Sequence, residues 1–74
     1  MSTHEDFYRA RAAEARADAD AATLDNVRER CLRSAIAWEG MADRVRRTDR
    51  LRTETAARKA AEAAALASVD GATA

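Results

Sequence analysis

Alanine accounts for most of the apolar residues of this 74-residue chain, and this limits the possible folds more than any other feature. Of 35 apolar residues, 21 are alanine and only 14 have larger side chains. Burial stabilises a fold by roughly 25 cal/mol per Å² of apolar surface, so a methyl group contributes little. A chain this short normally needs a disulfide, a metal or a partner subunit in addition to its core.

Few other sources of stability are available to a chain with such a small core. Cys31 is the only cysteine, so no internal disulfide can form, and Cys31 with the single histidine, His4, is not a metal-binding set. We therefore expect no metal and no cofactor. The remaining source of stability is a second protein chain, most simply another copy of this one. A homodimer is therefore the favoured assembly.

Backbone preferences predict an all-α fold. Proline is absent, glycine occurs only at positions 40 and 71, and alanine and arginine together supply 33 residues. Alanine and arginine both favour helices. A first apolar stripe at helical spacing comprises Tyr8, Ala12, Ala15, Ala19 and Ala22. A second stripe, spaced alternately by three and four residues, comprises Leu24, Val27, Cys31, Ala35, Trp38, Ala42 and Val45.

The segment TLDN, residues 23–26, separates the two stripes. A straight helix through it would place the second stripe about 160° from the first, whereas a turn aligns them. Thr23, Asp25 and Asn26 suit helix caps. We predict an antiparallel hairpin over residues 1–59, with helices over about 4–22 and 25–59. One long helix remains the alternative, because Phe7, Ala10, Ala17, Ala21 and Leu24 also form a row.

The hairpin prediction fixes which residues face each other, because facing residue numbers must add up to about 49. Five pairs follow: Tyr8 with Met41, Ala12 with Trp38, Ala15 with Ala35, Ala19 with Cys31, and Ala22 with Val27. The first helix begins near residue 4, so it covers the second helix only to about residue 45, and the apolar stripe ends there, at Val45. Residues 60–74 form an alanine-rich tail, which we expect to fray and to be disordered from Gly71.

Trp38 and Cys31 lie on the second stripe, so we interpret both as core residues rather than as a recognition aromatic and a reactive thiol. The carboxylates are scattered singly, and no phosphate-binding loop or nucleophile motif is present. We therefore expect no catalytic site and no enzyme activity. No stretch is long and apolar enough to cross a membrane. The acidic beginning of the chain lacks a signal peptide, so we expect a cytoplasmic protein.

Charge is distributed unevenly although its net value is zero. Residues 1–26 carry a net charge of −3, and residues 43–59 carry +4. A candidate basic patch comprises Arg44, Arg46, Arg47, Arg50 and Arg52. It makes nucleic-acid binding the alternative function. Interspersed acidic residues and the absence of aromatic residues disfavour that function, and a solvated face or an acidic protein partner is preferred.

Four residues lie on the side of the second helix away from its apolar stripe. They form a candidate self-association face, which comprises Leu32, Ile36, Gly40 and Leu51. Gly40 within a helix costs about 1 kcal/mol relative to alanine, and a close helix crossing would offset this. We therefore expect two hairpins to pair through this face into a four-helix bundle. The alternative is a flexible, partly exposed flank. The expected function is a small interaction or oligomerisation protein, with an unidentified protein as a further partner.

The segment FYRARAAEARADADAATLDNVRERCLRSAIAWEGMADR combines three elements. They are an aromatic–Arg–Ala–Arg opening from Phe7 to Arg11, a Thr/Asp turn from Thr23 to Asn26, and an Ala-x-x-Trp motif from Ala35 to Trp38. Over about residues 5–47 it resembles a group of small uncharacterised bacterial proteins. The resemblance implies a helical hairpin and a bacterial source, and it implies no activity and no site residues.

Overall fold

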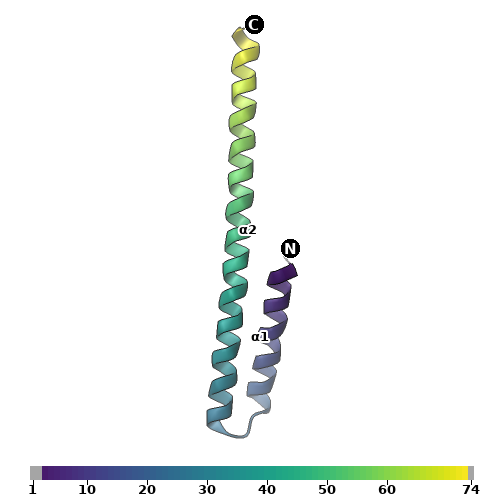
Figure 1. Cartoon of the computed structure of the whole chain (residues 1–74), viewed down its shortest axis with the longest axis vertical. Coiled ribbons are helices and arrows are strands. Elements are labelled where there is room, and N and C mark those ends of the chain that lie inside the picture. The colour runs from purple at the N-terminus through teal and green to yellow at the C-terminus, as the bar shows by residue number, and fades with distance from the viewer. Residues whose placement is uncertain (1–2, 74) are drawn as a thin grey trace.

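The structure, a computed structural model, describes the backbone of residues 3–73 and the side chains of residues 3–69. Two helices make up the fold, α1 (Thr3–Ala21) and α2 (Asp25–Thr73). They run antiparallel, with α1 lying along the N-terminal part of α2 (Figure 1). The predicted all-α hairpin is therefore confirmed, and a single uninterrupted helix is wrong.

The turn between the helices lies where the sequence predicts it, at Ala22, Thr23 and Leu24. The amide of Arg28 donates to the carbonyl oxygen of Leu24 over 3.0 Å, which closes the first turn of α2. The Arg28 guanidinium donates to the carbonyl oxygen of Ala22 over 3.0 Å and to Asp25 over 3.1 Å. Arg28 thus links the end of α1 to the start of α2. The chain reverses direction without any residue of positive φ among those described.

Small side chains form the interface between the helices. Five alanines are buried, namely Ala12, Ala15, Ala19, Ala35 and Ala42. Methyl groups let two helix backbones approach more closely than large side chains do. On α2 the buried alanines alternate with the half-buried Cys31, Trp38 and Val45. We call these five residues of α2, Cys31, Ala35, Trp38, Ala42 and Val45, the α2 seam.

The second helix is longer than the sequence prediction. Its predicted end near residue 59 moves to Thr73, and no break separates residues 1–59 from the alanine-rich tail. High helix propensity, with no proline or glycine between residues 59 and 71, explains the extension. Fraying of this tail remains a prediction. The segment predicted to be disordered begins at Gly71 and includes Ala74, which lies outside the described residues.

Because α1 is shorter, part of α2 has no neighbouring helix. The first turn of α1 lies beside residues 44–53 of α2. Residues 54–73, which we call the overhang, continue alone (Figure 1). The described molecule is therefore a rod of 75 × 16 × 12 Å rather than a compact domain.

Candidate interaction surfaces

An aromatic cluster covers one side of the hairpin. Tyr8 stacks on Trp38 with ring centroids 5.7 Å apart, and Phe7 meets the indole edge-on at 6.0 Å. The guanidinium of Arg11 lies 5.5 Å from the centre of the indole. Such edge and stacked ring pairs add about 0.5–1.5 kcal/mol each beyond area burial. The cluster therefore fastens the start of α1 to the middle of α2.

The cluster corrects the predicted neighbours of Trp38. Its ring contacts are Phe7 and Tyr8 rather than Ala12 alone, because an aromatic side chain spans about one helical turn of 5.4 Å. Trp38 is half-buried and Phe7 is 54% exposed. Cys31 is also half-buried. Both seam residues therefore line the interface without being fully enclosed by it.

Ion pairs between the helices lie on the opposite side of the seam, and the sequence did not predict them. Arg16 donates two hydrogen bonds of 2.7 Å to Glu39, in a bidentate arrangement. Arg9 donates to Asp43 over 3.0 Å and also pairs with Glu5 over 3.3 Å. The bond from Arg16 lowers the pKa of Glu39, and the same bond raises the pKa of Arg16. These pairs fix the lengthwise register of α1 on α2.

The candidate self-association face lies on α2 away from α1, as predicted. Ile36 and Leu51 are 62% and 52% exposed, Gly40 is exposed, and Leu32 is half-buried. A methyl group built on Gly40 would meet no atom within 4 Å, so no helix of the hairpin crosses there.

This face is not continuous, because charged residues interrupt it. Between Gly40 and Leu51, the helical period of about 100° per residue places Arg44 and Arg47 on the same side. The four residues therefore make two separate apolar spots rather than one patch.

The structure does not bring the candidate basic patch together on one face. Arg46 and Arg50 line a hollow with Glu5, Asp6 and Asp49, on one side of the first turn of α1. Arg44 and Arg52 line another hollow with His4 and Val45 on its other side. Arg47 projects away from α1 by the helical period. The two pairs of arginines thus lie in different surroundings. A surface that binds a nucleic-acid backbone would instead present its basic side chains together on one face.

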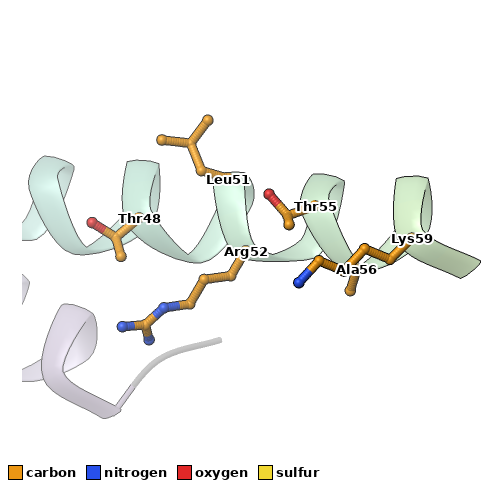
Figure 2. Close-up of a pocket in the computed structure, with 6 residues that line it drawn as sticks. All are labelled: Thr48, Leu51, Arg52, Thr55, Ala56 and Lys59. Atoms are coloured by element: carbon orange, nitrogen blue, oxygen red, sulfur yellow. The ribbon is translucent and has the colours of Figure 1, made fainter.

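A shallow apolar groove on α2 begins beside the first turn of α1. It encloses about 420 Å³ and is lined by Thr48, Leu51, Arg52, Thr55, Ala56 and Lys59. Leu51 and Arg52 point to opposite sides of the helix, and Arg52 extends toward the first turn of α1 (Figure 2). The sequence analysis named Leu51 and Arg52 in two different candidate sites and did not place them together in one groove, whose six lining residues all belong to α2.

Among the described residues, no group of three or more His, Cys, Asp or Glu side chains is placed to hold a metal. No helix in the described part of the chain is both long and apolar enough to span a bilayer.

No protein-family model, curated protein or solved structure matches this chain. A function must therefore be argued from the surfaces of the hairpin themselves.

Beyond the groove, the overhang leaves large apolar side chains uncovered. Leu66 is 67% exposed and Val69 is 58% exposed. Single exposed apolar residues are common on protein surfaces, but here they occur on an isolated helix that also carries the groove. The overhang is thus the largest part of the described chain without a packing partner.

Proposed function

We propose that this chain is a small, non-enzymatic helical protein whose function is to associate with itself and with other protein chains. The observation that carries the proposal is the mismatch in helix length. The hairpin covers α2 only to about residue 53, and Leu51, Leu66 and Val69 remain exposed on or beside the overhang. An isolated alanine-rich helix is only marginally stable in water, and a partner helix stabilises it.

The predicted four-helix bundle is one form of such an assembly. It would cover Ile36, which is 62% exposed, and Leu51, and it would bring a second helix against Gly40. Arg44 and Arg47 oppose this arrangement, since two copies of this face would place four guanidinium groups close together. Dimerisation through other parts of α2 avoids this repulsion.

Mass measurement tests the proposal. We expect light scattering coupled to size exclusion to give about twice the chain mass of 8.1 kDa at high micromolar concentration, with dissociation on dilution. Sedimentation equilibrium provides a second measurement that does not depend on shape. A chain that stays monomeric at every concentration up to millimolar contradicts self-association as its function.

A further inference from the structure

We draw no further inference here: the strongest candidate, the apolar surface patch that Leu66 and Val69 leave exposed on the overhang, carries nothing, because it belongs to the surface on which the proposed function rests and nothing in the structure shows what covers it.

Discussion

Enlarging one buried alanine of the α2 seam should separate the two helices of the hairpin. Ala35 has 0% exposure and lies in the middle of the stretch that α1 covers. Ala35→Leu adds three carbon atoms at a position with no surface exposed to solvent. The helices must then move apart or the leucine must leave its preferred rotamer, and overpacking of this kind costs about 1–3 kcal/mol.

The upper end of that range is expected here, because separation at Ala35 also opens the other alanine contacts. Close approach of the helices depends on Ala12, Ala15, Ala19 and Ala42 as well, and each loses contacts when the axes move apart. A domain of this length is stable by roughly 4–11 kcal/mol. A loss of about 3 kcal/mol therefore removes a large share of the total stability.

Fluorescence of Trp38 during urea titration is a suitable assay, because Phe7 and Tyr8 contact the indole only while α1 is docked. The control is Ala37→Leu, which makes the same change two residues away at an exposed position. We expect the midpoint of Ala35→Leu to fall well below that of Ala37→Leu, with little change in slope. Equal midpoints for the two variants would refute close packing through alanine.

Three further outcomes follow from the hairpin. Trp38→Ala should lower the free energy of unfolding, measured by chemical denaturation, by about 2 kcal/mol. This loss is smaller than for a fully buried tryptophan, because Trp38 is half-buried. The folded-state pKa of Glu39 lies below its ordinary value of 4.5, so its carboxylate stabilises the hairpin above that pH and this contribution is lost as pH falls through the lowered pKa. Glu39→Gln should flatten the fall in melting temperature over that acidic range, and an unchanged slope contradicts the role of the pair with Arg16. Gly40→Ala should raise the free energy of unfolding by about 1 kcal/mol, because the site has open space and alanine is the better helix former; a loss of stability would indicate a close crossing at this position.

The fold was predictable from sequence because two independent patterns agree. Two apolar stripes align only if the chain reverses near Thr23, and Asp25 and Asn26 supply the cap-forming residues there. The structure begins α2 at Asp25 and buries five of the six alanines of the two stripes, while Ala22 is half-buried. The alternative row that includes Phe7 and Leu24 faces solvent, with exposures of 54% and 61%.

The details of the surfaces were less predictable, because long side chains reach further than the register specifies. Arg16 pairs with Glu39, and Arg9 pairs with Asp43, although neither pair faces directly across the seam. An arginine has several carboxylates within its reach on an antiparallel neighbour, so sequence spacing alone does not choose among them. The predicted end of the second helix near residue 59 rests on the expectation that an unsupported alanine-rich extension frays. High alanine content carries the helix on to Thr73.

The difference in length between the helices supports the proposal that the overhang takes part in assembly. A hairpin whose only purpose was its own stability would gain nothing from the 20 residues beyond α1, since ordering each one costs about 1–2 kcal/mol of backbone entropy. Those residues leave Leu66 and Val69 exposed at 67% and 58%, whereas the positions that continue the α2 seam include the charged Asp49, Arg52 and Lys59. A partner that covers the overhang must therefore accommodate charged side chains as well as the two apolar ones.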